Sequence, residues 1–267
     1  MKNNLPIILD STAQEIASTL RKISQDVFTI YESAGYHNSH FRGKSLGSTV
    51  TNEQKKAIAN GTFDDLFIGD YWTINDINWR IAHFNYWSGS NHIVIVPDTN
   101  LATEKMNSSN TTAGGYIGSG LYTGTNADST SNTGLATAKT AFESAFGSSH
   151  IYTHKELLSN AVTSGVVSGV VWKDSGVELM SEQMVYGHSV WAKNGKEVGS
   201  SKTQLALFNL APVFIQKQRS WYWLRSVYSG SYFCYVNAYG PAYDADASYS
   251  LGVRPAAAIY FDDFLEN

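Results

Sequence analysis

Cysteine is nearly absent from this 267-residue chain, and it also lacks long apolar runs and clusters of basic residues. The single Cys234 excludes an internal disulfide framework and any zinc site built from several cysteines, so the fold depends on packing. The formal net charge is −4 and the lysines and arginines are scattered, which argues against binding to a phosphate backbone. We therefore expect no nucleic-acid partner.

The start of the chain, MKNNLPIILDST, has one lysine and then only four apolar residues, in the short stretch LPIIL. Such a run is too short for a signal peptide, and no later segment approaches the length of a membrane span. We expect a protein made without export and with no membrane partner. Charged residues make up only 16%, aromatic residues 13%, and Gly, Ser, Thr and Asn are abundant. This composition is common in extracellular display proteins and phage fibres, although an ordinary β-rich domain could share it.

Residues 11–34 are predicted to form a helix, because apolar residues recur at alternating spacings of four and three: Ile16, Leu20, Ile23, Val27 and Ile30. This seam suits a short coiled coil, with a homotrimer favoured, but it would equally suit a helix packed on its own domain. A second, short helix is expected over Thr51–Asn60, closed by Gly61. We therefore predict a helical region over residues 1–60 and a domain over residues 61–267.

The rest of the chain predicts a mixed α+β fold. A hairpin is expected around the turn Asn75-Asp76, and a central strand over His92–Val96. Residues 107–134 are rich in Ser, Thr, Asn and Gly and predict a loop or a mobile flap. Helices are expected over Leu135–Phe146 and His154–Val162.

The C-terminal segment carries the motifs WLRS and SLGVRPA. Together with GDYWTINDINWRIAHFNYW, HIVIVPDTNL, MVYGHSVW and QLALFNLAP, they resemble phage and prophage proteins of Gram-positive bacteria that share an uncharacterised domain. The likeness covers residues 61 to 261. WLRS and GVRPA also resemble the closing strands of the C-type-lectin-like fold, as in formylglycine-generating enzymes and the variable proteins of diversity-generating retroelements. The resemblance implies a virion protein whose C-terminal domain is C-type-lectin-like.

Two arginines flank the most distinctive part of this segment. Trp223, Leu224 and Val253 suit buried strand positions, and Arg225 and Arg254 could tie adjoining strands through carboxylates or carbonyls. An arginine could instead clamp an anionic ligand, but one arginine per strand among apolar neighbours favours a structural role.

Between Val227 and Ser250 the chain consists almost wholly of Tyr, Ser, Gly, Asn, Ala and Asp. Tyr offers a large contact area and a polar tip while losing few torsions, and Ser, Gly and Asn adapt around it. We predict a ligand-binding surface for a saccharide or a protein; the alternative is that these tyrosines line a fixed core. The nine candidate residues are Tyr228, Tyr232, Tyr235, Asn237, Tyr239, Tyr243, Asp244, Asp246 and Tyr249. In the retroelement-diversified proteins that the segment resembles, this residue set arises from mutable codons, and the composition permits that mechanism.

Metal chemistry is not expected, and we predict no cofactor. The formylglycine-generating relatives use paired cysteines that bind copper, and Cys234 has no partner. His150 and His154 have the spacing of a helical metal pair, but no Glu follows His150. Two acidic pairs offer oxygen ligands for calcium, although the motifs of calcium-dependent lectins are missing: Asp244 with Asp246, and Asp262 with Asp263.

Enzymatic activity is also not expected. No nucleophile elbow, P-loop or dinucleotide motif is present. Two acidic pairs could suggest a glycosidase, but such pairs are more often simply solvated: Asp64 with Asp65, and Glu178 with Glu182.

The sequence thus favours a phage virion protein that attaches to a host cell-surface ligand through the Tyr-rich segment. The N-terminal helix would dock to other virion proteins, and self-association would turn weak contacts into avidity. The leading alternative is a capsid decoration, head-fibre or tail-fibre protein whose tyrosines pack at subunit interfaces. A third hypothesis is a sugar-cleaving enzyme.

Overall fold

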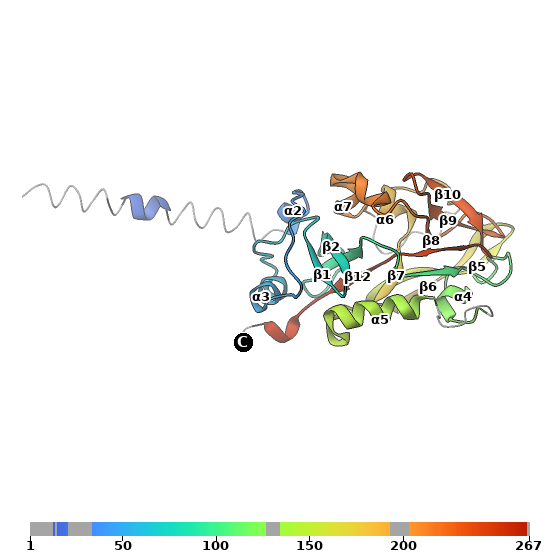
Figure 1. The fold of residues 1–267 in the computed structure, drawn as a ribbon, viewed down its shortest axis with the longest axis horizontal. Coiled ribbons are helices and arrows are strands. Elements are labelled where there is room, and N and C mark those ends of the chain that lie inside the picture. The colour runs from blue at the N-terminus through green and yellow to red at the C-terminus, as the bar shows by residue number, and fades with distance from the viewer. Residues whose placement is uncertain (1–12, 14, 21–33, 127–133, 193–202, 266–267) are drawn as a thin grey trace, which may run out of the picture.

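The computed structural model describes residues 13, 15–20, 34–126, 134–192 and 203–265, which form a mixed α+β fold with several sheets (Figure 1). The first sheet has the strand order β1-β2-β3-β12-β7. Its strands are β1 (Tyr71–Ile74), β2 (Ile77–Phe84), β3 (Ile93–Pro97), β12 (Pro255–Ile259) and β7 (Val177–Leu179). All paired neighbours in this sheet are antiparallel, and β12 brings the end of the chain against β3 from its first half.

The second sheet has the order β10-β9-β8-β11-β4, and a long hairpin of two strands lies beside it. Its strands are β10 (Ala242–Asp246), β9 (Tyr232–Val236), β8 (Tyr222–Val227), β11 (Ser250–Val253) and β4 (Ala102–Lys105). The separate hairpin pairs β5 (His154–Thr163) with β6 (Val166–Ser175). Strands β8, β9 and β10 follow one another as an antiparallel meander, so the Tyr-rich segment forms one end of this sheet.

Helices cover both faces of the first sheet (Figure 1). On one face the ring of Phe142 in α5 lies 4.6 Å from that of Trp79. On the other face the N–H of Ala206 in α7 donates to Nδ1 of His83. The helices are α2 (Ala34–His37), α3 (Asn52–Asn60), α4 (Gly120–Thr123), α5 (Leu135–Phe146), α6 (Glu182–Tyr186) and α7 (Ala206–Leu210), with 3₁₀ turns η1 (Ser148–His150), η2 (Pro212–Gln216) and η3 (Asp262–Phe264).

Several local predictions are confirmed. Helix α3 begins after Thr51, whose side chain forms a capping box with Gln54, and it ends at Gly61, which adopts a left-handed conformation. The hairpin of β1 and β2 turns at Asn75 and Asp76, whose φ angles of 52° and 60° match the two-residue turn that suits the twist of paired strands. Strand β3 lies in the middle of its sheet, and α5 occupies the residues predicted for it.

The helix predicted over His154–Val162 is wrong, because these residues form strand β5. The spacing of its apolar residues imitates a helix, but Ser164 and Gly165 next to it adopt positive φ angles and turn the chain into β6. The β-branched residues of β6 then pair with it: Val162 lies opposite Val167 and Leu158 opposite Val171. The turn and the partner strand therefore decide the conformation of β5.

Over residues 107–126 the Ser/Thr/Asn/Gly-rich segment is a packed loop that contains the short helix α4, whereas residues 127–133 lie outside the described residues. Its Tyr116 is fully buried, and the N–H groups of Tyr116 and Ile117 donate to Ser159 in β5. Thr112 is buried as well and donates to the carbonyl of Ser229 beyond β8. Through these hydrogen bonds the loop links the β5–β6 hairpin to the residues just after β8 in the second sheet.

The N-terminal seam is described only in part. Ile16 and Leu20 lie in helical residues and are 55% and 61% exposed, whereas Ile23, Val27 and Ile30 lie outside the described residues. Residues 34–60 contact the domain beyond the predicted boundary, as the following bonds show. Arg42 pairs with the buried Asp70 at 2.6 Å, and Trp72 donates its indole N–H to Gln54 at 3.0 Å. The division at residue 61 stays a prediction.

Both arginines of the C-terminal motifs are buried and bonded within the domain, as predicted. Arg254 is the residue between β11 and β12, where the chain passes from the second sheet to the first. Its side chain donates to the carbonyls of Pro97 and Ile215, at 2.8 and 3.1 Å. Trp223, Leu224 and Val253 are fully buried. No helix among the described residues is long and apolar enough to cross a membrane.

Candidate functional site

The nine residues predicted for ligand binding lie on and beside strands β8, β9 and β10. Three of them are exposed: Tyr239 in the β9–β10 turn at 83%, Tyr243 on β10 at 50%, and Tyr249 before β11 at 56%. Tyr235 on β9 is only 5% exposed. The remaining five are partly buried: Tyr228, Tyr232, Asn237, Asp244 and Asp246. These residues lie on strands and turns of the second sheet, and they differ in how far a ligand could reach them. Their role in ligand binding stays a prediction.

Strand β9 is covered on both faces. Phe233, Cys234 and Val236 are fully buried, and Tyr235 nearly so. Strand β9 is also an interior strand of its sheet, between β8 and β10. The exposed rings therefore come from the turns and from the neighbouring strand rather than from β9.

Six aromatic rings form a continuous row over this end of the second sheet, which we call the aromatic stripe. In order along the row they are Tyr232, Tyr228, Trp191, Tyr243, Tyr235 and Trp221. The centroids of successive rings lie 6.4, 5.5, 5.2, 6.0 and 5.6 Å apart. These separations are typical of favourable aromatic pairs, so the rings support one another's orientation.

A buried carboxylate holds Trp191 in the middle of the stripe. Glu182 in α6 accepts the backbone N–H groups of Val190, Trp191 and Ala192 at 2.8, 3.0 and 3.0 Å. The indole N–H of Trp191 donates to the carbonyl of Ala242 at 3.0 Å. Charge-assisted bonds of this kind fix a loop more firmly than neutral ones. The stripe therefore has a preorganised centre.

One end of the stripe borders a hollow of about 320 Å³. Trp221, which is 45% exposed, lines it together with Arg219, Ser220 and Ser250. Exposed rings, hydroxyls and one guanidinium thus meet at this end. Such a combination offers both flat apolar contact and hydrogen bonds to a ligand.

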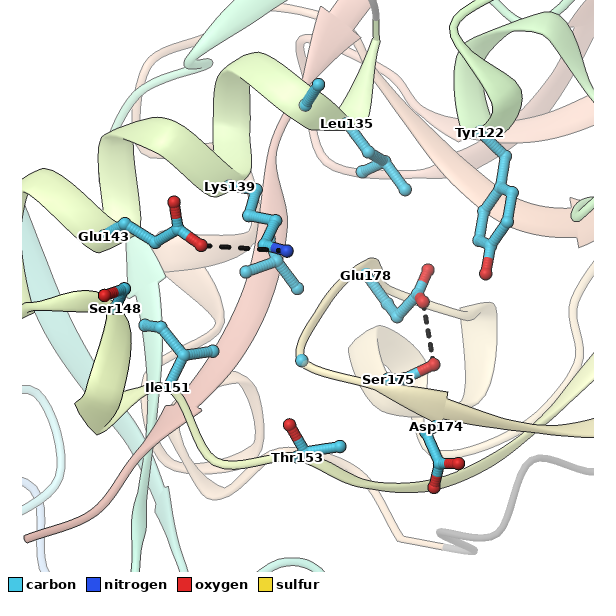
Figure 2. A pocket seen from close by; sticks show the side chains of 13 residues that line it. Tyr122, Leu135, Lys139, Glu143, Ser148, Ile151, Thr153, Asp174, Ser175 and Glu178 are labelled. Atoms are coloured by element: carbon cyan, nitrogen blue, oxygen red, sulfur yellow. Dashed lines mark hydrogen bonds and ion pairs between the residues drawn. The ribbon is translucent and has the colours of Figure 1, made fainter.

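A second, larger cavity of about 460 Å³ lies between α5, the 3₁₀ turn η1 and the β6–β7 connection (Figure 2). Tyr122 and Glu178 point toward one another on one side, and Lys139 and Glu143 project from α5 on another. The lining residues are Tyr122, Leu135, Ala136, Lys139, Glu143, Ser148, Ile151, Thr153, Asp174, Ser175, Gly176, Val177 and Glu178. A cavity of this size holds a small ligand.

Charged side chains are buried behind this cavity. Glu178 accepts hydrogen bonds from the hydroxyls of Tyr116 and Ser175, both at 2.8 Å. Deeper in the interior Arg225 forms an ion pair with Glu156. All five side chains lie in residues that are less than 9% exposed. Burying charges is costly unless they are paired and hydrogen-bonded, so this arrangement constrains how β5, β7 and β8 pack.

The two buried carboxylates have pKa values on opposite sides of the ordinary one. Burial raises the pKa of Glu178 to about 6 despite the hydrogen bonds it accepts. Burial alone would also raise the pKa of Glu156, but the charge of Arg225 and the bonds from His154 and Trp87 lower it to about 2. The difference arises because Arg225 is bonded to Glu156 and not to Glu178.

A third hollow, of about 670 Å³, adjoins the second cavity and shares Thr153 and Asp174 with it. Its walls are largely aromatic, and they include Trp87 stacked on His154 with ring centroids 3.6 Å apart. Trp172 on β6 is 55% exposed at its edge. The β5–β6 hairpin therefore carries exposed aromatic surface of its own.

The histidine pair His150 and His154 and the glutamate pair Glu178 and Glu182 are each divided between different surroundings. His150 lies in η1 and bonds the carbonyl of Phe146, whereas His154 starts β5 and contacts Glu156. Glu178 faces the cavity, but the carboxylate of Glu182 is occupied by backbone donors beside Trp191. Within the described residues no three metal-binding side chains of the His, Cys, Asp or Glu type form a group.

Sequence reasoning missed several residues of these two regions. Trp191 and Trp221 complete the stripe, yet each lies outside the Tyr-rich interval. Glu182 positions Trp191 from a distance of nine residues, and no motif signals that role. Glu156 and Glu178 meet Arg225 only because three separate strands come together.

Residues 159–260 match the family model of a domain of unknown function, DUF6273. No curated protein and no solved structure gives a significant match to the chain. The matched residues run from within β5 through β12, so they include the aromatic stripe, Glu178, Glu182 and Arg225. They leave out β1, β2 and β3, which complete the first sheet. The family description assigns no activity.

Proposed function

We propose that the protein is a phage virion protein that binds a host cell-surface ligand, a saccharide or a protein, through the aromatic stripe. The observation that carries the proposal is the unbroken row of six rings whose central Trp191 is held by Glu182. The proposal that the protein belongs to a virion draws its support from the motifs WLRS and SLGVRPA.

The chemistry of the stripe suits adhesion. Aromatic rings bury much area while few torsions are lost, and tyrosine hydroxyls add hydrogen bonds at the edge of the contact. The faces of sugar rings pack on such surfaces, and so do apolar patches of proteins. Because the three-bond anchor fixes Trp191 beforehand, little order has to be created on binding.

The fold we propose is C-type-lectin-like. Two features of the topology support this proposal. Strand β12, near the end of the described chain, pairs with β3 from the first half. The meander of β8, β9 and β10 falls between β3 and β12 in the sequence and forms part of the second sheet. We further propose that the N-terminal helix self-associates as a trimer that docks to the virion. The exposure of the apolar Ile16 and Leu20 supports an unfilled contact there.

The test is the binding of labelled full-length protein to a panel of Gram-positive cells. Replacing Trp221 and Tyr243 of the stripe, together with Tyr239 of the β9–β10 turn, with Ala is expected to lower the affinity at least tenfold while the fold is kept, because these three side chains are exposed. Tyr235 is left intact, since its ring is buried. Saturable cell binding that survives the triple substitution contradicts the proposal.

A matched control is Trp172→Ala, which removes an equally exposed ring from the β5–β6 hairpin. Its binding is expected to equal that of the wild type. Loss in this variant, with none in the triple variant, would place the contact on the hairpin instead of the stripe.

The alternative is a decoration or fibre protein in which the stripe packs against another virion subunit. It is favoured if purified protein binds isolated phage shells but no cells, and if the triple substitution abolishes that binding. The continuous row of rings suits a fixed protein interface as well as a ligand.

A further inference from the structure

The cavity between α5 and the β6–β7 connection is a site separate from the aromatic stripe, and its walls select a particular kind of ligand. Its lining combines one buried carboxylate with hydroxyls, apolar side chains and one tyrosine ring. We propose that this cavity binds an amino sugar with a free amino group, with the ammonium on Glu178 and the sugar ring against Tyr122.

Glu178 brings a negative charge to the cavity that no cation in the described part of the chain pairs with. Two carboxylates, Glu156 and Glu178, lie near one guanidinium, and Arg225 forms its ion pair with Glu156. The cavity lining also contains the amino group of Lys139. This group lies 3.7 Å from a carboxylate oxygen of Glu143, and the Lys139 side chain is 63% exposed. Among the described residues, Glu178 therefore has no ion pair of its own. A cationic group entering the cavity would supply one.

Glu178 also has remaining capacity for hydrogen bonds. An ionised carboxylate offers about four acceptor sites, and Tyr116 and Ser175 use two of them. An ammonium group has three donors and no acceptor, so it can occupy the free sites without competing with the two hydroxyls. Burial raises the pKa of Glu178, because the hydrogen bonds it accepts and the charge of Arg225 offset only part of the loss of water.

The remaining walls of the cavity suit the rest of the ligand. The ring of Tyr122 forms a wall opposite Glu178, and its hydroxyl forms no hydrogen bond with any described residue (Figure 2). Ser148 and Thr153 place further hydroxyls on the lining, while Leu135 and Ile151 add apolar area. Alternating hydroxyls and apolar surface match a sugar ring better than a simple alkylamine. The volume of about 460 Å³ has room for one or two sugar units.

The experiment is calorimetric titration of the full-length protein at pH 7 with the disaccharide of glucosamine, and in parallel with its N-acetylated form. Acetylation removes the positive charge and keeps the ring. Saturable binding of the free amine, at least tenfold tighter than that of the acetylated sugar, is expected. Equal binding of both sugars, or binding of neither, overturns the proposal.

Two variants locate the site. Glu178→Gln removes the charge and is expected to weaken binding of the free amine at least tenfold. Because that change could disturb the interior, Ala136→Trp provides a second variant: Ala136 is exposed on α5 and lines the cavity, so a large ring there fills it while Glu178 stays in place. Unchanged binding in both variants refutes the site.

The controls separate this site from other effects. Thr140→Trp places the same ring on α5 outside the cavity lining and is expected to leave binding unchanged. Methylammonium is expected to bind at least tenfold more weakly than the disaccharide. If it binds equally well, the assignment to an amino sugar is wrong. These results are independent of cell binding by the stripe, since the stripe variants leave the cavity intact.

Discussion

The aromatic stripe and the charged interior behind the cavity are built in opposite ways. The stripe is carried by tyrosine and tryptophan rings at a surface, and one buried carboxylate, Glu182, acts on it only through backbone bonds. The interior holds Glu156, Glu178 and Arg225 away from water, where every charge influences the others. The comparison teaches that the exposed rings of the stripe can be changed at low cost to folding, whereas a change in the interior is coupled to stability.

The largest effect is expected from Arg225→Met. It leaves Glu156 buried without its cation, and breaking a buried ion pair on one side costs about 3 to 5 kcal/mol. Urea unfolding measures the loss. The matched control is Lys155→Met, because Lys155 and Asp174 form a pair at 2.7 Å whose side chains are both more than 60% exposed. That control is expected to cost less than about 1 kcal/mol. Similar losses for the two variants would remove the distinction between interior and surface.

A smaller loss of stability is expected from Glu182→Ala. Glu182 is a buried carboxylate, like those of the interior, but it holds a ring of the stripe. Three backbone N–H groups lose a charged acceptor, and hydrogen bonds to charged groups contribute about 1.5 to 3 kcal/mol each at most sites. Because these groups can turn to water, we expect a net loss of about 2 kcal/mol together with a freed Trp191. Acrylamide quenching of tryptophan fluorescence should therefore increase. The control is the double variant Glu182→Ala with Trp191→Phe, in which the increase should disappear because the freed indole is gone.

Local sequence signals predicted parts of the secondary structure, whereas the surface was indicated only by composition. Local signals were sufficient where they agree with the tertiary structure: the capping box at Thr51, the turn at Asn75 and the apolar stripe of α5. They failed at β5, whose apolar residues have a helix-like spacing. The turn at Gly165 and the pairing with β6 make this segment a strand. The Tyr-rich interval indicated the stripe through composition alone.

The partners of Arg225 were beyond local signals for a physical reason. The sequence predicted a structural role for Arg225, but Glu156 and Glu178 come from two other strands, and each looks like an ordinary strand residue until the strands meet. The role of Glu182 was hidden in the same way, because its partners are backbone groups that carry no sequence signal. Burial and pairing are properties of the assembled fold, so they could not be read from spacing.

A pH titration sharpens the comparison further. The pKa of Glu178 rises to about 6 in the folded protein from an ordinary value of 4.5, so the folded state binds this proton more tightly. Its contribution to stability is therefore complete at low pH and is lost as the pH rises from about 4.5 to above 6. The shift corresponds to about 2 kcal/mol. The unfolding free energy of wild type, minus that of Glu178→Gln, should fall by this amount across the window.

Glu156 provides the internal control for this titration. Its pKa is lowered to about 2, so its contribution is present above the ordinary value and is lost only as the pH falls below about 4.5. The two carboxylates thus act in different pH ranges. Parallel curves for wild type and Glu178→Gln between pH 4.5 and 7 would show that Glu178 is not desolvated.

The smallest effect is expected from Tyr239→Ala in the turn between β9 and β10. The side chain is 83% exposed, so its removal should change the free energy of unfolding by less than about 0.5 kcal/mol. Tyr235→Ala, two strand positions before the same turn, removes a ring that is 5% exposed and should cost about 3 kcal/mol or more. Thermal unfolding of both variants compares them directly. If Tyr239→Ala lowered the free energy of unfolding by more than about 1 kcal/mol, the exposed tyrosines would contribute to the stability of the fold. Tyrosines that stabilise the fold cannot be replaced freely, so such a surface would be poorly suited to changes of ligand.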